Sequence, residues 1–139
     1  MQFSKTLSVF SFISTALATT VSYDIQYNNS TGSLAVTACS DGPNGLMTRF
    51  KWKTYSDVPN FPYIGGVEAI EGWNSKNCST CWAVTYGDRT IYILGIDHTA
   101  RGLNINFEAM NDLTKDNALI LGRIEANAQP APGLHYCGL

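Results

Sequence analysis

The 139-residue sequence is poor in charge and has no excess of basic residues. Only 14% of its residues are charged, well below the roughly 25% of a typical soluble protein. Nine Lys and Arg stand against eleven Asp and Glu, which gives a net charge of −2. Because neutralising phosphates requires a basic face, this balance argues against nucleic acid as a partner. A surface covered instead by Asn, Ser, Thr, Gly and Tyr suits neutral polar ligands such as sugars.

The sequence also lacks a hydrophobic run long enough to span a bilayer, which takes about 20 residues. Its apolar stretch at residues 6–17 follows one cation, Lys5, and leads into the A-x-A motif of residues 16–18. A buried N-terminal helix would not require such a motif. We therefore predict that residues 1–18 are a secretory signal peptide and that the secreted mature chain, without a membrane span, begins at Thr19 or Thr20.

Motifs for phosphate, catalytic zinc and a serine nucleophile are missing as well. No Gly-rich loop joins a strand to a helix, no H-E-x-x-H pair is present, and no Ser stands in a nucleophile elbow. His98 and His135 are isolated in the sequence, and lone histidines are more often surface or packing residues. We expect no cofactor and no metal.

Four cysteines are present, namely Cys39, Cys78, Cys81 and Cys137. An even count in a secreted chain predicts two disulfides. A redox C-x-x-C motif would need a thioredoxin-type context, and a Cys₄ zinc site would need a second close pair. We favour the pairing Cys39–Cys78 and Cys81–Cys137, which sends each member of the close pair to a distant partner, although the sequence alone allows three connectivities.

The remaining chain reads as one compact β-rich domain over residues 19–139. We predict strands at residues 21–27, 34–38, 81–86, 90–96 and 119–126, the last with Gly122 as a bulge or close approach. The third and fourth of these form a hairpin with a three-residue loop, residues 87–89. Helices are predicted at residues 67–73 and 107–113, the second capped by Asn106, and residues 58–66 are predicted to be irregular.

Asp97 is the first candidate for chemistry, because it directly follows the apolar strand at residues 90–96. A carboxylate at the end of a buried strand is desolvated on one side, a setting suited to a general acid. The alternative is structural: Asp97 accepts backbone N–H bonds from the following loop or pairs with Arg101. His98 beside it could orient a ligand.

Glycoside hydrolysis would need a second carboxylate, about 5–5.5 Å away in retaining enzymes and roughly 6.5–9.5 Å in inverting ones. No spacing rule selects Asp24, Asp41, Asp112 or another acid as that partner. Aromatic side chains offer a softer mode of sugar binding, by stacking on the rings. The candidates are Tyr23, Tyr63, Trp73, Trp82 and Tyr92.

Nine ordered motifs carry a resemblance to a known family. They are residues 21–24 (VSYD), 39–42 (CSDG), 45–47 (GLM), 61–62 (FP), 65–66 (GG), 72–74 (GWN), 78–82 (CSTCW), 95–97 (GID) and 102–104 (GLN). The set closely resembles the cerato-platanin family and runs from Val21 to Cys137, with all four cysteines in place.

The resemblance implies a double-psi β-barrel, as in expansin domain 1, barwin and a family of inverting cellulases. It also implies the pairing Cys39–Cys78 and Cys81–Cys137. Cerato-platanins are small secreted fungal proteins of the cell wall and culture medium, so we expect an extracellular and wall location.

The function implied by the resemblance is binding without turnover. Family members bind chitin-type N-acetylglucosamine oligomers in a shallow groove, loosen cellulosic material without hydrolysis and act as elicitors of plant defence, which implies a plant surface receptor. On this basis Asp97 takes the position of the family's groove aspartate, and Asn104 and Val84 fall on groove positions. Tyr23 is expected to add apolar contact. Asp97→Ala should then abolish loosening and weaken binding while leaving the fold intact.

Two other functions stay open. Several family members self-assemble and coat interfaces, so the chain could be a monomer that assembles into a surface film. The related cellulases carry a second carboxylate on the first strand, and Asp24 lies near that strand. An inverting glycoside hydrolase with Asp97 as its acid therefore remains the less favoured alternative.

Overall fold

A computed structural model describes residues 18–139 of the chain. Apart from Ala18, the predicted signal peptide lies outside the described residues. The strands are β1 (Ala18–Tyr23), β2 (Ile64–Val67), β3 (Cys81–Tyr86), β4 (Arg89–His98), β5 (Leu103–Ile105) and β6 (Arg123–Pro130). The helices are α1 (Leu46–Phe50), α2 (Phe107–Thr114) and α3 (Ala118–Leu121), and the 3₁₀ turns are η1 (Ile25–Asn28), η2 (Leu34–Val36), η3 (Tyr55–Asp57) and η4 (Leu134–Cys137).

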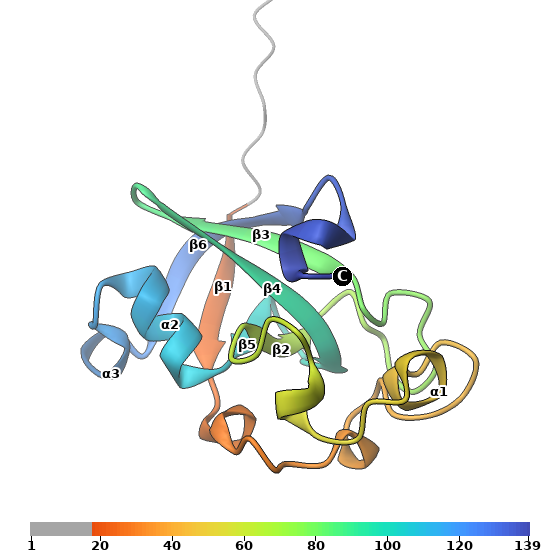
Figure 1. The fold of residues 1–139 in the computed structure, drawn as a ribbon. Coiled ribbons are helices and arrows are strands. Elements are labelled where there is room, and N and C mark those ends of the chain that lie inside the picture. Colours follow the sequence, from red (N-terminus) through yellow and green to blue (C-terminus); the bar gives the residue numbers. More distant parts are fainter. Residues whose placement is uncertain (1–17) are drawn as a thin grey trace, which may run out of the picture.

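The six strands form a closed barrel in the order β1-β5-β2-β4-β3-β6 (Figure 1). β1 closes it by pairing in parallel with β5 and antiparallel with β6. The interior is filled by the inward residues of each strand, as the alternation of Ile124, Ala126 and Ala128 on β6 illustrates. Closure removes the sheet edges that would otherwise pair with other chains. The predicted β-barrel with few short helices is confirmed.

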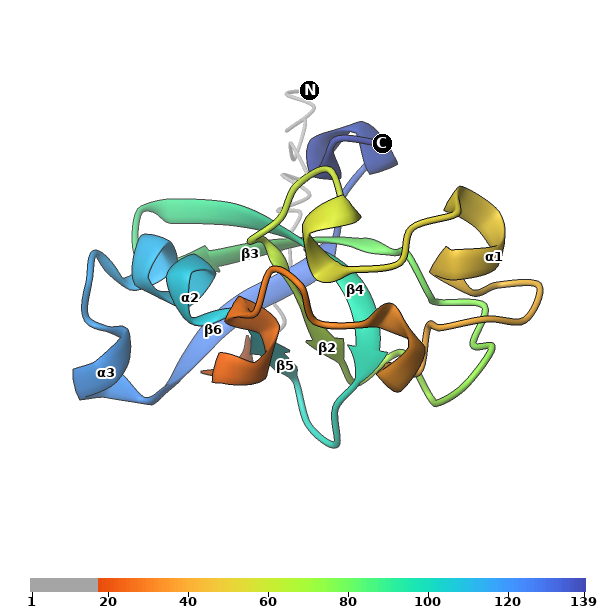
Figure 2. The same ribbon diagram turned by 60° about the horizontal axis from the view of Figure 1, so that its bottom comes forward.

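Residues 24–63 form a long irregular stretch, which we call the covering segment. It carries η1, η2, α1 and η3, and it runs across the side of the barrel that comes forward in Figure 2, where it is the orange and yellow ribbon. Its inward side chains are fully or almost fully buried, among them Tyr27, Leu34 and Leu46. The covering segment therefore extends the core although it contributes no strand to the barrel.

Both predicted disulfides are present. Cys39–Cys78 ties the covering segment to the loop before β3, with a sequence separation of 39. Cys81–Cys137 ties the start of β3 to η4, with a separation of 56 residues. Each half of the C-x-x-C motif thus serves a different bridge.

Two local predictions from the sequence are confirmed closely. The strand at residues 81–86 is β3, and that at residues 90–96 lies within β4. Asn106 caps α2, because its side-chain oxygen accepts the N–H groups of Glu108 and Ala109. The hairpin loop is shorter than predicted: Tyr86 pairs with Arg89, so only Gly87 and Asp88 form the turn.

Other local predictions are wrong. Residues 67–73 are not helical: Val67 ends β2, and residues 68–73 form turns. Residues 34–38 are not a strand: Leu34–Val36 form the 3₁₀ turn η2, which the Ser33 hydroxyl caps by accepting the Ala35 N–H. Residues 58–66 are irregular only until β2 begins at Ile64.

The first and last predicted strands are each partly wrong. β1 ends at Tyr23, because the Asp24 carboxylate caps η1 by accepting the Gln26 N–H. At the other end, α3 occupies the start of the predicted strand at 119–126, and β6 begins only at Arg123. Gly122 is neither a bulge nor a close approach: it ends α3 with a φ of +66°, which favours glycine, and nothing lies near its Cβ position.

Candidate functional site

Strand register places a row of polar residues across the outer face of the barrel. Gly66 of β2 pairs with Asp97 of β4 on one side and with Asn104 of β5 on the other. Asn104 pairs in turn with Ser22 of β1, and Ser22 with Arg123 of β6. We call Asp97, Asn104, Ser22 and Arg123 the polar row. At about 4.8 Å per strand, Asp97 and Asn104 lie roughly 10 Å apart.

A β-bulge brings Asp97 into this row. Gly65 pairs with Gly95, but the next residue, Gly66, pairs with Asp97, so Ile96 is the extra residue on β4. A one-residue shift exchanges the faces of a strand. Ile96 can therefore stay fully buried while the next side chain, Asp97, is only half-buried. Gly66 itself must be glycine, since a Cβ there would lie 2.9 Å from the His98 carbonyl oxygen.

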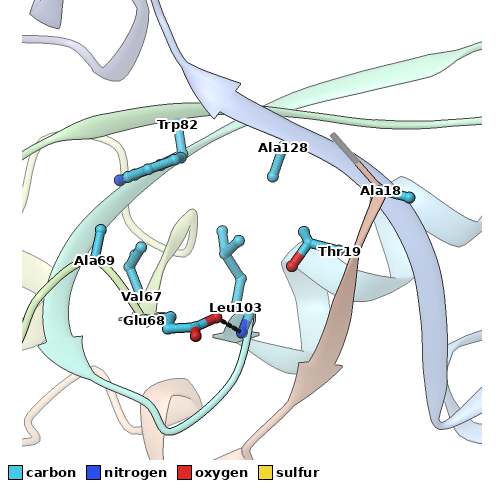
Figure 3. Close-up of a pocket in the computed structure, with 9 residues that line it drawn as sticks. Ala18, Thr19, Val67, Glu68, Ala69, Trp82, Leu103 and Ala128 are labelled. Carbon is cyan, nitrogen blue, oxygen red and sulfur yellow. Dashed lines mark hydrogen bonds between the residues drawn. The ribbon is translucent and has the colours of Figure 1, made fainter. Parts of the chain in front are cut away.

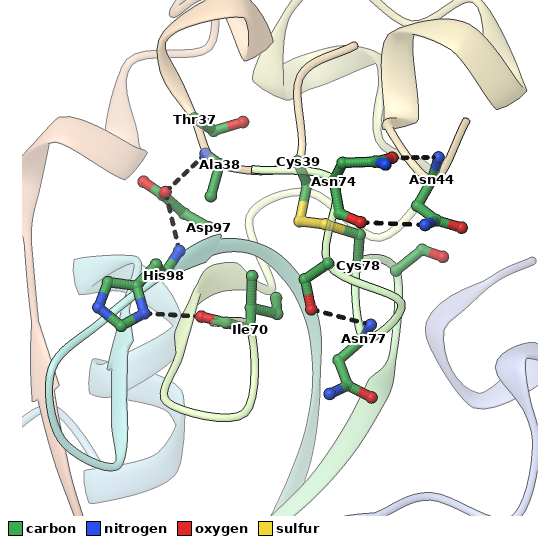
Figure 4. Close-up of a disulfide and its surroundings, with 12 residues drawn as sticks. Thr37, Ala38, Cys39, Asn44, Ile70, Asn74, Asn77, Cys78, Asp97 and His98 are labelled. Carbon is green, nitrogen blue, oxygen red and sulfur yellow. Dashed lines mark hydrogen bonds between the residues drawn. A yellow bond between two sulfur atoms is a disulfide. The ribbon is translucent and has the colours of Figure 1, made fainter. Parts of the chain in front are cut away.

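Three donors engage the Asp97 carboxylate, and Figure 4 shows the two that are backbone N–H groups. Its Oδ1 accepts the backbone N–H groups of Ala38 and His98, each at 2.8 Å. Its Oδ2 accepts the Tyr27 hydroxyl at 2.9 Å. Asp97 therefore has the structural role considered above, as an acceptor of backbone N–H bonds. The ion pairs within residues 18–139 do not include one between Asp97 and Arg101. Asp97 fastens the covering segment to the end of β4.

This geometry changes the expectation for Asp97→Ala. Tyr27 is only 1% exposed, and the substitution would leave its hydroxyl without this acceptor. A buried donor without a partner costs about 1–3 kcal/mol. We therefore expect Asp97→Ala to destabilise the fold as well as to weaken binding, because Asp97 supports the fold as well as facing outward.

The burial of Tyr27 and Tyr55 near Asp97 also changes their pKa values. Burial, followed by the nearby Asp97 carboxylate and the hydrogen bond to it, raises the pKa of Tyr27 well above its usual range. Burial and then Asp97 and Asp24 also raise the pKa of Tyr55. Both tyrosines therefore stay protonated at neutral pH, and the Tyr27 hydroxyl donates to Asp97 as a neutral group.

The other end of the polar row is more open. The Asn104 side-chain oxygen accepts the Ser22 hydroxyl at 3.0 Å, and both residues are half-buried. No hydrogen bond within residues 18–139 engages the Asn104 amide N–H groups, which can therefore donate to a ligand. Arg123 beside them is exposed. Tyr23 is half-buried and packs edge-to-face on Phe107, with ring centroids 4.9 Å apart, so part of its ring is already covered.

Val84 does not share this surface. It lies on β3 and its side chain is fully buried in the barrel core. Because the alternation of β3 turns Val84 inward, its side chain cannot contact a ligand on the outer face. The prediction that Val84 is a groove residue is therefore corrected: Val84 is a core residue.

The side chains of His98 and Asp24 are both engaged in hydrogen bonds within the protein. The His98 Nδ1 lies 2.6 Å from the Ile70 carbonyl oxygen, which can only accept, so Nδ1 carries the proton. The Asp24 carboxylate accepts the backbone and side-chain N–H groups of Gln26. Asp24 and Asp97 both raise the pKa of Tyr27 and of Tyr55.

The two tryptophan candidates lie apart from the polar row and from each other. Trp73 is 64% exposed on a loop, and its Nε1–H donates to Asp41 at 2.7 Å. Trp82 lines a hollow of about 370 Å³ at one end of the barrel, together with Val67, Leu103 and Ala128 (Figure 3). One Glu68 carboxylate oxygen there accepts the Gly102 N–H. This hollow is mostly apolar and holds no member of the polar row.

Sequence reasoning missed four residues of the site: Ser22, Tyr27, Gly66 and Arg123. Ser22 and Gly66 lie inside the quoted motifs, but nothing in their local pattern shows that strand register joins them to Asn104 and Asp97. Tyr27 was placed in a strand, whereas it lies in η1 with its hydroxyl directed at Asp97. Among the described residues, no cluster of His, Cys, Asp and Glu could hold a metal. None of the helices within residues 18–139 is both long and apolar enough to cross a bilayer.

Comparisons with known proteins agree with this architecture. The cerato-platanin family model matches residues 19–139. The chain is 40% identical to "Allergen Asp f 15" of Aspergillus fumigatus over 149 aligned positions, which cover 97% of each chain. Among solved structures, cerato-platanin 2 from M. perniciosa superposes with a TM-score of 0.83 at 36% identity, covering 88% of this chain and all of that one. The fungal elicitor Cerato-Platanin superposes with a TM-score of 0.75 at 36% identity, covering 85% and 95% of the two chains.

Proposed function

The chain belongs to the cerato-platanin family, and from this premise we propose that it is a secreted, non-catalytic cell-wall protein that binds chitin-type N-acetylglucosamine oligomers. In this proposal the open end of the polar row holds the sugar. Binding to cellulose at the same place would loosen the polysaccharide without cutting it. Recognition by a plant surface receptor would make the protein an elicitor, the activity named for one structural relative.

The observation that carries the proposal is the polar row itself. Four polar side chains from β4, β5, β1 and β6 align on one outer face. Asn104 presents amide N–H donors, and Ser22 and Arg123 extend the strip of hydrogen-bonding groups. Amide, hydroxyl and guanidinium groups match the hydroxyl and acetamido groups of an aminosugar chain. Such a surface, without an enclosing pocket, favours weak binding along an extended polymer.

The hydrogen bonds of Asp97 favour binding over hydrolysis. A general acid must donate a proton to the leaving oxygen. Both oxygens of Asp97 instead accept hydrogen bonds from the protein, and the Asp24 carboxylate is engaged with Gln26. Contacts of this kind compete with the hydrogen bonds between glucan chains but do not activate water.

An NMR titration of the mature protein with N-acetylglucosamine tetramer tests the proposal. We expect saturable shifts of the amides around Asn104 and Ser22, with the sugar intact after a day. Asn104→Ala should weaken binding about tenfold, or ~1.4 kcal/mol. Asn127→Ala is the matched control, because Asn127 is an exposed asparagine on β6 and lies outside the polar row. New reducing ends from the tetramer would refute the non-catalytic reading, and shifts that persist unchanged in Asn104→Ala would refute the site.

A second candidate, the interfacial coat protein, is favoured by one observation. α3 exposes three consecutive apolar side chains, with Leu119 76%, Ile120 84% and Leu121 40% accessible. Large apolar groups presented together on one short helix favour adsorption to an interface. If this function dominates, Leu119→Ser with Ile120→Ser should abolish film formation, and the tetramer should cause no shifts in the wild-type protein.

A further inference from the structure

A second pocket, remote from the polar row, is lined by three tyrosines. Its volume is about 260 Å³, and its lining includes Asn60, Tyr63, Tyr92, Asp112 and Tyr136. We call it the tyrosine pocket. These residues come from the covering segment, β4, α2 and η4. Ligand pockets for drug-sized molecules begin near roughly 300 Å³, so this one suits a single ring-sized group.

Two of the tyrosines form a continuous aromatic wall. The Tyr92 and Tyr136 rings lie with centroids 4.9 Å apart and planes inclined by 33°. Tyr136 is 42% exposed, so its ring is accessible from solvent. The hydrogen bonds within residues 18–139 engage neither the Tyr92 hydroxyl nor the Tyr136 hydroxyl, so both can serve a ligand.

A fixed carboxylate faces this wall. The Tyr63 hydroxyl donates to the Asp112 Oδ2 at 2.7 Å, and Arg89 donates to Oδ1 through Nε at 3.1 Å and through a second nitrogen. The Tyr63 hydroxyl, followed by Arg89, lowers the pKa of Asp112, which therefore stays ionised as an acceptor. A carboxylate has about four acceptor positions, so one on Oδ2 remains for a ligand hydroxyl.

The pocket is held in shape before any ligand arrives. Tyr136 directly precedes Cys137, whose disulfide to Cys81 fastens η4 to the barrel. The Asn60 side-chain N–H groups donate to the carbonyls of Tyr63 and Tyr92, which joins the covering segment to β4. Preformed aromatic and polar groups lose little entropy on binding.

We propose that the tyrosine pocket binds one neutral sugar ring, whose C–H face packs on Tyr92 and Tyr136 while a hydroxyl donates to Asp112. An aromatic wall with one fixed acceptor matches a ring that has an apolar face and a polar edge. Arg89 offsets the charge of Asp112, so the pocket favours an uncharged ligand over an ion. Because Tyr92 precedes Asp97 by five residues on β4, the two sites lie about 16 Å apart along the strand. The pocket is thus a second binding site that does not depend on the polar row.

The experiment is a titration of the mature protein with N-acetylglucosamine tetramer and, separately, with cellotetraose. NMR signals of the tyrosine rings report the pocket, and the Asn104 and Ser22 amides report the polar row. We expect saturable shifts of the Tyr92 and Tyr136 rings with at least one of the two sugars. Tyr136→Ala should weaken this binding about tenfold and leave the row signals unchanged.

Three further variants give the experiment its controls. Leu134 also lies in η4 and is 40% exposed, close to the 42% of Tyr136, so Leu134→Ala is the matched control and should leave sugar binding at wild-type strength. Tyr136→Phe keeps the ring and should retain most of the affinity. Asn104→Ala should weaken binding at the polar row only, which separates failure of this inference from failure of the proposed function. Absence of ring shifts with both sugars would overturn the inference, as would ring shifts that persist undiminished in Tyr136→Ala.

Discussion

The barrel and the covering segment are stabilised in different ways. In the barrel, each strand is hydrogen-bonded to two neighbours, and inward side chains fill a shared core. The covering segment, residues 24–63, adds buried side chains to this core but contributes no strand to the barrel, and a few separate attachments fasten it. Asp97 binds Tyr27 and Ala38, Asn106 donates to the Tyr27 carbonyl at 2.7 Å, and the Cys39–Cys78 disulfide closes the set.

The difference teaches where single substitutions should act. A closed sheet spreads the loss of one contact over many neighbours, whereas a segment fastened at a few points releases locally when one of them is removed. Asp97 matters because it connects the two regions. It lies near the end of β4, and its carboxylate anchors the covering segment. The proposed sugar site is therefore coupled to the stability of this segment.

The largest effect is expected from removing the Cys39–Cys78 disulfide by Cys39→Ala with Cys78→Ala. On the loop-entropy model a bridge that closes about 40 residues contributes roughly 4 kcal/mol. The melting temperature should fall by about 10–20 °C. In hydrogen exchange, protection should be lost mainly in residues 24–63.

The control for this prediction is Cys81→Ala with Cys137→Ala, which removes a bridge of similar loop entropy. Protection should then be lost mainly at η4, and sugar binding at the tyrosine pocket should weaken while the polar row is retained. If both double variants lost protection in the same residues, the claim that the barrel and the covering segment are stabilised in different ways would be contradicted.

The next largest effect is expected from Asp97→Ala, at about 3 kcal/mol of unfolding free energy. The substitution removes three hydrogen bonds and leaves the buried Tyr27 hydroxyl without its acceptor. Asp97→Asn should cost only about 1 kcal/mol, because the amide oxygen can still accept from the backbone and the amide nitrogen can donate to the Tyr27 oxygen.

Urea unfolding measures both Asp97 variants, with Glu125→Ala as a control at an exposed strand position. The control should change stability by less than about 0.5 kcal/mol. Equal stability of Asp97→Ala and the control would show that Asp97 does not anchor the covering segment.

The smallest effect is the pH dependence contributed by Tyr27. Its pKa is raised in the folded state, so the folded protein retains this proton after the unfolded chain has lost it. The contribution is fully present below the unfolded pKa of about 10, and it is lost progressively as the pH rises above that value. Stability should therefore fall above pH 10 by up to about 1.4 kcal/mol per pH unit for this group.

Tyr27→Phe should cost about 1 kcal/mol at pH 7, because Asp97 loses one donor, and should flatten the alkaline slope. Unfolding in urea at pH 8 to 11 measures both effects. Tyr63→Phe provides the comparison in a more exposed setting, where the pKa of Tyr63 is raised chiefly by its hydrogen bond to Asp112. A slope that is unchanged in Tyr27→Phe would contradict the assignment.

Local sequence patterns predicted the elements whose structure is decided locally. The β3–β4 hairpin follows from two β-branched, aromatic runs around a Gly-Asp turn. The start of α2 follows from Asn106, a good N-cap residue. The disulfides follow from cysteine spacing read together with the family resemblance.

The wrong predictions fall where distant strands override local preference. Residues 67–73 look helical, but Val67 pairs with both His98 and Leu103 and is taken into the sheet. β5 has only three residues and is specified by β1 and β2 on its two sides, so no local signal marks it.

By itself, the sequence determined a β-rich domain with two disulfides and an aspartate at the end of an apolar strand, because residue type, spacing and turn chemistry act over a few positions. Only the tertiary structure decided that Ser22, Asn104 and Asp97 share one face, that Val84 points inward, and that Tyr136 joins Tyr63 and Tyr92. These relations depend on the register and bulges of strands far apart in the chain. A shift of one residue in any of those strands would turn the same side chains to the opposite face.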